Sequence, residues 1–225
     1  MGGTDMKQRL LAILIGLGCT IGALAGDRAN VLTDKENKAG FELLFNGTDL
    51  RGWEHNKNWA VEDGAITRKK GGGELTYKAK KIPDDFELRF EWKVARGSNS
   101  GIYYRPGQYE YQILDNKVHG DGKNPRTSAA SLYFCMAPSK DATKPVGEWN
   151  HVRLLVTPEK CVHEINGVKY FEYVLGSEDF NARVAKSKFH SMPLFAKAGS
   201  GYIALQGDHG QVMFRNIKLL PIAAK

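Results

Sequence analysis

Hydrophobic and polar residues alternate with a period of two in many short runs of this chain, which is the pattern of half-buried strands. The clearest run is Phe86-Glu-Leu-Arg-Phe-Glu-Trp-Lys-Val94, in which apolar residues alternate only with charged ones. Such a strand packs one face on a core and turns the other toward water. Residues 59–68 and 161–173 each hold two such runs, and the Asp63-Gly64 and Asn166-Gly167 dipeptides between them predict tight hairpins.

Further strand-like runs lie between turn residues along the rest of the chain, while helical patterns are scarce. Only residues 177–188, which begin with a Ser cap, predict a short helix. With 225 residues and 42% hydrophobic content, one sizeable core is expected in a single domain. The pattern predicts an all-β, two-sheet antiparallel β-sandwich with at most one or two short helices. The additional strand candidates are residues 41–45, 102–105, 109–114, 129–136, 149–156, 202–206 and 212–220.

The first 25 residues have the composition of a signal peptide. Lys7 and Arg9 precede an apolar run over residues 10–24, and Ala23-Leu-Ala25 fits the small-x-small pattern of a cleavage site. We expect cleavage after Ala25 and export to the periplasm or the exterior, since the run is too short for a membrane span. A rival interpretation makes Cys19 a lipid-bearing anchor. Residues 26–39 are polar and predict a flexible entry segment before a domain at residues 40–222.

The charge balance argues against nucleic acid as a partner. Loss of residues 1–25 removes Asp5, Lys7 and Arg9 and lowers the formal net charge from +7 to +6. The basic clusters at residues 68–70 and 78–81 lack interleaved aromatic residues that could stack on bases. A basic exported protein is instead compatible with acidic sugars or anionic surfaces.

The two cysteines left after such cleavage, Cys135 and Cys161, both lie in apolar strand-like runs. They could form a disulfide on neighbouring strands in an oxidising compartment, or remain two buried thiols. No cysteine spacing indicates zinc or a nucleophilic thiol.

Residues 99–116 hold the densest combination of ionisable, amide and aromatic side chains on strand-like sequence. Pro106-Gly107 predicts a turn between two strands. In the second strand, alternation places Glu110 and Gln112 on the face opposite to Tyr109. Asp115 lies an odd number of residues from Glu110, so one β-bulge would be needed to bring it to the same face.

Two loops carry further candidate residues. Residues 117–128 form a polar loop that contains His119, and Gly207-Asp-His-Gly210 joins the last two strands. Long loops in β domains often carry function, which makes His119 and His209 candidates for a site.

Several long motifs, in order, resemble the 3-keto-disaccharide hydrolase domain family, formerly domain of unknown function 1080. They extend over about residues 40–222, and a small departure is Gly207, which lengthens the usual Leu-Gln-Asp-His-Gly run. The resemblance implies a concanavalin A-like jelly roll, related in shape to laminarinases, that is usually exported and acts on glycosides oxidised at C3. The motifs are Gly40-Phe-Glu-Leu-Leu-Phe-Asn-Gly-Thr-Asp-Leu-Arg-Gly-Trp53, Ser100-Gly-Ile-Tyr-Tyr-Arg105, Tyr109-Glu-Tyr-Gln-Ile-Leu-Asp-Asn116, Gly147-Glu-Trp-Asn150, Gly201-Tyr-Ile-Ala-Leu-Gln-Gly-Asp-His-Gly210 and Phe214-Arg-Asn-Ile217.

A C3 ketone acidifies the proton on C2, so a base can remove it and the enolate can expel the anomeric oxygen before water adds. Such a site needs a base, a group that stabilises the enolate, and an acid for the leaving group. From residue chemistry, the base is Glu110 or His209 and the proton donor is Asp115 or His119. Arg105 would stabilise the enolate. Gln112 and Gln206 would read hydroxyl groups, with Tyr103 and Trp149 as further sugar contacts. The hypothesis requires Arg105, Glu110 and Gln112 to project into one sugar-sized hollow.

Two other functions compete with this hypothesis. Glu110 and Asp115 could act as the carboxyl pair of a retaining glycosidase, although the intervening Gln112 cannot share a proton. A non-catalytic lectin-like module could instead stack Trp53, Trp149, Tyr103 and Tyr109 on sugar rings.

Structural roles are also open for several of these residues. Arg105 could simply pair with Glu110, and Trp149 could fill the core. No cofactor is expected. Glu110, Asp115, His119 and His209 could converge on a divalent cation, although no spacing demands one.

Overall fold

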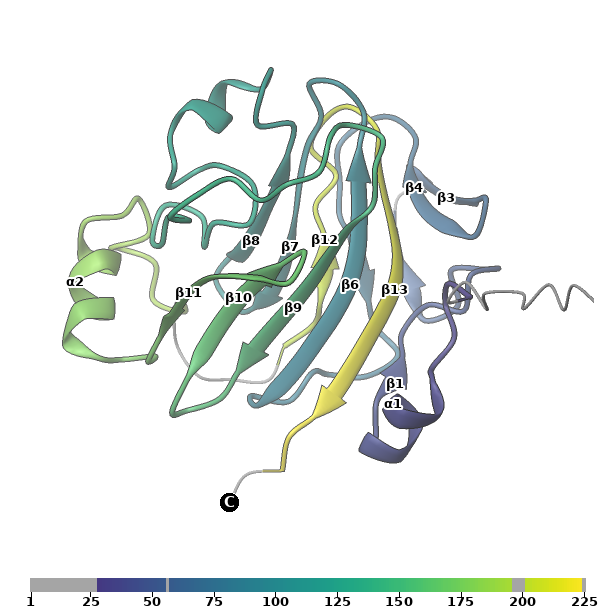
Figure 1. The fold of residues 1–225 in the computed structure, drawn as a ribbon, viewed down its shortest axis with the longest axis horizontal. Helices are drawn as coiled ribbons and strands as arrows, with labels where there is room; N and C mark the ends of the chain where they lie inside the picture. Colours follow the sequence, from purple (N-terminus) through teal and green to yellow (C-terminus); the bar gives the residue numbers. More distant parts are fainter. Residues whose placement is uncertain (1–27, 56, 196–200, 224–225) are drawn as a thin grey trace, which may run out of the picture.

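Two antiparallel sheets packed face to face form the protein, as the computed structural model shows for residues 28–55, 57–195 and 201–223 (Figure 1). Sheet A has the order β11-β10-β9-β6-β13-β4-β3, with β1 also paired to β13. Sheet B has the order β2-β5-β12-β7-β8. This arrangement confirms the predicted all-β sandwich. The strands of sheet A are β1 (Glu42–Leu43), β3 (Trp59–Glu62), β4 (Ala65–Arg68), β6 (Phe86–Val94), β9 (Asn150–Val156), β10 (Cys161–Ile165), β11 (Val168–Tyr173) and β13 (Val212–Pro221); those of sheet B are β2 (Trp53–Glu54), β5 (Leu75–Tyr77), β7 (Asn99–Arg105), β8 (Tyr109–Leu114) and β12 (Ala204–Leu205).

The core lies between the two sheets and is built by the alternation that the sequence shows. On β6, the five apolar residues from Phe86 to Val94 are all buried. The inner face of sheet B contributes Tyr104, Tyr109 and Tyr111, and Tyr111 meets Phe90 edge to face with ring centroids 5.3 Å apart. The outward face of β6 departs from the expected contact with water, because Glu87 and Glu91 are also buried.

The two hairpins predicted from Asp-Gly and Asn-Gly are confirmed. Asp63 and Gly64 have φ of 49° and 70°, and Asn166 and Gly167 have φ of 50° and 76°. Both central residues therefore lie in the left-handed region, which matches a turn type that follows the right-handed twist of the flanking strands.

Two segments differ from expectation. Residues 129–136 form consecutive turns with one isolated bridge to β8, at Leu132, rather than a strand, and Ala130 and Phe134 both have positive φ. The segment expected to be a flexible entry contains helix α1 (Asp34–Ala39), which Thr33 and Glu36 close with a reciprocal capping box. Local capping chemistry explains a helix that has no apolar stripe.

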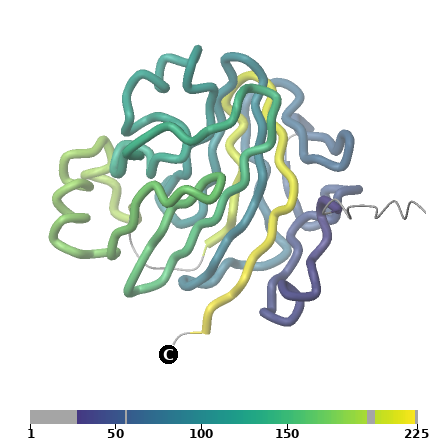
Figure 2. The backbone as a smooth tube through the Cα atoms, in the orientation of Figure 1, coloured from purple at the N-terminus to yellow at the C-terminus, as the bar shows by residue number. Residues whose placement is uncertain are grey.

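Two long connections between the sheets, from β8 to β9 and from β11 to β12, lie next to the β8 edge of sheet B (Figure 2). They include the 3-10 helix η1 (Gly120–Lys123) and helix α2 (Glu178–Ala185), whose N-cap is Ser177 as predicted. Tyr133 in the first connection and Phe189 in the second have ring centroids 6.4 Å apart. These contacts bring residues from two distant parts of the chain to the outer face of sheet B.

Cys135 and Cys161 are buried free thiols, so the second of the two cysteine alternatives holds. No helix within the described residues is long and apolar enough to cross a membrane. The predicted signal peptide and the alternative lipid site at Cys19 lie outside the described residues.

Candidate functional site on the outer face of sheet B

The candidate site is centred on Glu110, in the middle of β8. Glu110 pairs with Tyr103 of β7, and Gln112 pairs with Gly101. Directly opposite residues of an antiparallel pair project to the same face. Because Tyr109 and Tyr111 fill the core, Glu110, Gln112 and Tyr103 lie on the outer face of sheet B, as the period-two pattern predicted for the two β8 residues.

Glu110 is a buried acid without a compensating partner. The residue is 4% exposed, and no hydrogen bond or ion pair engages its carboxylate within residues 28–223 as the structure describes them. Burial raises the pKa of Glu110 to about 8, and the negative charges of Asp208, Asp121 and Glu74 act in the same direction. An acid with a pKa near neutrality can both take and return a proton.

Gly101 provides the space that the Glu110 carboxylate occupies. A Cβ atom at residue 101 would lie 2.2 Å from Oε1 of Glu110. A glycine is therefore required by close approach here, since its backbone φ is not in the left-handed region.

Tyr103 and Gln206 form a polar pair next to Glu110. Nε2 of Gln206 donates a hydrogen bond of 2.7 Å to the Tyr103 hydroxyl. Burial and the charge of Glu110 raise the pKa of Tyr103. The hydroxyl therefore keeps its proton at neutral pH and can donate it to an oxygen in the site.

Loop residues Asp208 and His209 stand at the end of β12 on the same face. Nδ2 of Asn99 donates to Asp208 (2.9 Å), and Nδ1 of His209 lies 3.2 Å from the same carboxylate oxygen. The rings of His209 and His119 have centroids 4.9 Å apart. The two loops that the sequence singled out therefore meet, although they are about ninety residues apart in the chain.

Arg68 fixes this loop and was missed as a site-supporting residue. The sequence analysis treated it only as part of the basic cluster at residues 68–70, but it is 6% exposed and ends β4. Its guanidinium donates 2.6 Å hydrogen bonds to the carbonyls of Asp208 and Gly210. The signal in the sequence was a basic residue at the end of a buried strand, where a guanidinium can satisfy several carbonyls at once.

Lys188 is a further residue that sequence reasoning did not find. It follows α2, and its ammonium lies 4.4 Å from the centre of the Tyr133 ring and 5.1 Å from those of Phe134 and Phe189. Its charge is the leading influence that lowers the pKa of Glu110 against the effect of burial. Three rings thus hold one cation beside the buried acid.

Arg105 does not join Glu110. The register between β7 and β8 shifts between Tyr103 and Arg105, so Arg105 pairs with Tyr109 instead of continuing the alternation. This bulge turns Arg105 to the face of Tyr109, where its positive charge acts to lower the pKa of the Tyr109 hydroxyl against the larger effect of burial. Nη2 of Arg105 donates 2.6 Å to the carbonyl of Asp84.

Asp115 and Trp149 also lie apart from Glu110. Asp115 accepts hydrogen bonds from the backbone of Gly97 (2.9 Å) and Lys117 (3.0 Å), which makes it a turn residue rather than a neighbour returned by a bulge. Trp149 packs under the Arg215 guanidinium at 4.1 Å, on the outer face of sheet A. Gln112 is 1% exposed and accepts from the backbone of Ile113 through Oε1.

No group of three or more His, Cys, Asp or Glu residues that could hold a metal ion occurs in the described part of the chain. The convergence of Glu110, Asp115, His119 and His209 on a cation is not formed, because Asp115 is engaged in its turn.

The fold and the polar outer face define a concanavalin A-like jelly roll of the kind found in carbohydrate-active enzymes and lectins. Residues 40–220 match the model of the 3-keto-alpha-glucoside-1,2-lyase-like domain, and the chain belongs to this family. The expected family is thereby confirmed.

A curated relative from Bacteroides thetaiotaomicron, named 3-keto-disaccharide hydrolase, is 32% identical, and the alignment covers 97% of this chain and 90% of the relative. A crystal structure from Parabacteroides distasonis, of a protein proposed to be a glycosyl hydrolase, is 28% identical with a TM-score of 0.77 and covers 87% of this chain and 100% of that one. The lumenal domain of VIP36 (9% identity, TM-score 0.51, covering 83% of this chain and 92% of that one) shares the fold. The family and the relative support an enzyme of the hydrolase class.

Proposed function

We propose that this protein cleaves 3-keto-glycosides, including 3-keto-disaccharides, by removal of the C2 proton, elimination of the anomeric oxygen and hydration. Support comes from the family, from the named relative and from one observation above all. That observation is Glu110, a carboxyl group with a pKa of about 8 on the outer face of a sugar-enzyme fold.

Glu110 is the proposed base. Its carboxylate takes the proton from C2, and the released electron pair forms the C2–C3 double bond while the C3 carbonyl becomes an enolate oxygen. In the next step the C3 carbonyl re-forms, a C1–C2 double bond forms, and the C1–O bond to the leaving group breaks. Water then adds its oxygen to C1 and gives one proton to the group that protonated the leaving oxygen, while protonated Glu110 returns a proton to C2, which gives net hydrolysis.

Lys188 takes the role that the sequence gave to Arg105. The enolate oxygen needs a cation or a hydrogen-bond donor in a site of low dielectric constant. Lys188 supplies the positive charge that lowers the pKa of Glu110, and the protonated hydroxyl of Tyr103 can donate a hydrogen bond to the enolate oxygen.

The proton for the departing oxygen comes from the His119 and His209 pair in this proposal. The two rings are neighbours, and Nδ1 of His209 lies 3.2 Å from the carboxylate of Asp208. Gln206 and Gln112 remain the proposed readers of sugar hydroxyls.

The test compares a 3-keto-glucoside with its unoxidised parent, and aglycone release is followed for both. We expect turnover of the ketone alone, and a slower reaction when deuterium replaces the C2 hydrogen. Turnover of the parent would favour direct glycoside hydrolysis, and tight binding of both without turnover would identify a lectin.

Export is part of the proposal and has its own test. Expression in the native host followed by N-terminal sequencing should give Gly26 as the first residue of a periplasmic or secreted form. A diacylglyceryl group on Cys19 would instead show a lipid-anchored protein.

A further inference from the structure

A cavity lined by several charged side chains lies on the outer face of sheet A, on the other sheet from Glu110. Its volume is about 450 Å³, which is in the range of small-molecule sites. It is enclosed by the segment 28–36 and by strands β6, β9 and β13. The lining residues are Arg28, Val31, Leu32, Thr33, Glu36, Arg89, Phe90, Glu91, His151, Val152, Arg215, Asn216 and Lys218.

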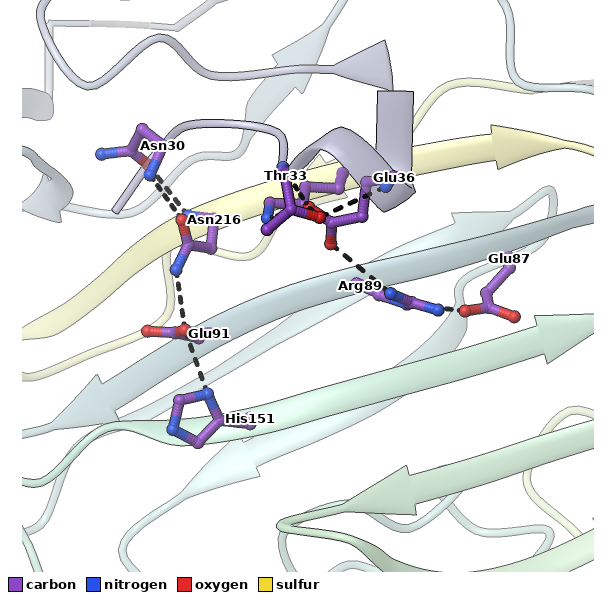
Figure 3. A network of polar contacts seen from close by, with 9 residues as sticks. Asn30, Thr33, Glu36, Glu87, Arg89, Glu91, His151 and Asn216 are labelled. Atoms are coloured by element: carbon purple, nitrogen blue, oxygen red, sulfur yellow. Dashed lines mark hydrogen bonds and ion pairs between the residues drawn. The ribbon is translucent and has the colours of Figure 1, made fainter. Parts of the chain in front are cut away.

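The segment that covers this cavity is held by a polar network (Figure 3). The backbone N–H groups of Asn30 and Asn216 each donate to the side-chain oxygen of the other residue. Nδ2 of Asn30 also donates to the carbonyl of Gly64 (2.7 Å). The wall of the cavity is therefore tied to sheet A by residues 186 positions apart in the chain.

The two carboxylates of the lining are already fully engaged. Glu91 accepts from Asn216 (2.7 Å) and from Nε of Arg215 (2.6 Å), and Nδ1 of His151 lies 3.0 Å from its carboxylate. Glu36 accepts from Lys218 (2.7 Å) and from the backbone of Thr33 (2.9 Å). Neither acid has a free face for a cationic ligand.

The guanidinium groups have hydrogen-bonding capacity left. Arg215 uses Nε for Glu91 and packs on the Trp149 ring at 4.1 Å. Arg89 uses Nε for Glu87 (2.7 Å) and Nη1 for Glu36 (3.4 Å), and packs on Phe41 at 4.4 Å. Within the described residues, no hydrogen bond engages the Nη groups of Arg215. Stacking and the Nε bond fix the plane of the guanidinium, which leaves a rigid fork of donors.

The net charge of the lining is positive. Arg28, Arg89, Arg215 and Lys218 supply four positive charges against the two of Glu36 and Glu91, which leaves an excess of two before His151 is counted. A ligand with acceptor oxygens and negative charge would satisfy this excess, whereas a neutral sugar would leave it unpaired.

We propose that this cavity binds a small oxyanion-bearing ligand of about monosaccharide size, such as a uronic acid. The Nη groups of Arg215 hold the anion, and Arg28 contributes a second positive charge. The inference is independent of the proposed function, because it concerns the opposite sheet and none of the groups around Glu110.

The test is calorimetric titration of the full protein with glucuronate, sulfate, phosphate and glucose at constant ionic strength. We expect binding of glucuronate and none of glucose. Arg215→Lys keeps the charge but loses the fork, and should weaken glucuronate binding about ten-fold. Arg153→Lys is the matched control, since Arg153 pairs with Glu87 and Glu164 on the same face without lining the cavity, and should leave binding unchanged.

The panel of ligands and variants also distinguishes a site for any oxyanion from a site that recognises the sugar as well. Equal binding of sulfate, phosphate and glucuronate, weakened to the same extent by Arg215→Lys, supports an oxyanion site that does not recognise the sugar ring. If Arg215→Lys fails to fold, the exposed Arg28→Gln substitution takes its place and should weaken binding several-fold. Absence of heat with every oxyanion, or equal weakening by Arg215→Lys and Arg153→Lys, overturns the proposal.

Discussion

Two glutamates on opposite sides of the sandwich, the partly buried Glu36 of α1 and the buried Glu110 of β8, show how the surroundings of a carboxylate decide between a structural and a chemical role. Burial alone would raise the pKa of Glu36, but hydrogen bonds from Lys218 and Thr33 lower it below the ordinary value. Burial raises the pKa of Glu110 to about 8, and Lys188 opposes this without a direct bond. The first acid stabilises a segment, and the second is left available for proton transfer.

The largest expected effect follows from removal of the unpaired acid. Glu110→Gln should lower kcat/KM for a 3-keto-glycoside by about 10²–10⁴-fold, because a positioned general base contributes this much. Steady-state assays with Glu36→Gln as the control check the comparison, since that residue should matter for stability and not for turnover. Comparable activity of Glu110→Gln and the wild type would remove Glu110 from the mechanism.

The free energy of unfolding should fall when an acid with bonded partners, such as Glu91, is replaced, and not when the unpaired Glu110 is replaced. Glu91 is buried among Arg215, Asn216 and His151, so Glu91→Ala should lower the free energy of unfolding by about 3 kcal/mol through the uncompensated charge it leaves. Glu110→Gln should instead raise the free energy of unfolding at pH 7, by on the order of 3 kcal/mol, because the native state no longer holds a carboxyl group whose pKa burial raises to about 8 from its ordinary unfolded value. Urea unfolding of both variants measures the difference. A larger loss for Glu110→Gln would show that its carboxyl group has a structural partner.

The space around the unpaired acid gives a smaller effect. Gly101→Ala should displace the Glu110 carboxylate and reduce kcat/KM by about 10–100-fold, with a destabilisation of about 1–3 kcal/mol from overpacking. Gly120→Ala is the control, because a Cβ there meets nothing within 4 Å. Kinetics and thermal unfolding of the pair separate crowding from the general effect of an added methyl group.

The pH profile gives the smallest change. A base must be ionised, so kcat/KM should rise with pH and level off above about 8, the pKa of Glu110. The charge of Lys188 favours the ionised form. Lys188→Met should therefore move the midpoint to higher pH and reduce kcat/KM at pH 7 by about ten-fold. An unchanged midpoint in this variant would place Lys188 outside the electrostatic environment of Glu110.

Local periodicity was enough to predict the sandwich, both hairpins, the α2 cap, and the shared face of Glu110 and Gln112. The placement of Arg105 was not predictable, because the bulge after Tyr103 depends on how Tyr104 and Arg105 pack between the sheets. Lys188 was equally hidden. Its position depends on contacts with Tyr133 and Phe134. Both rings lie in the segment 129–136, whose composition predicted a strand but which forms turns.

The position of β13 has a consequence for the kinetics of folding. This last strand pairs with β6, β4 and β1, and its Asn216 binds Asn30 near the beginning of the described chain. Sheet A therefore cannot close before β13 has left the ribosome. Dependence on pairing between segments far apart in the chain is typical of slowly folding topologies.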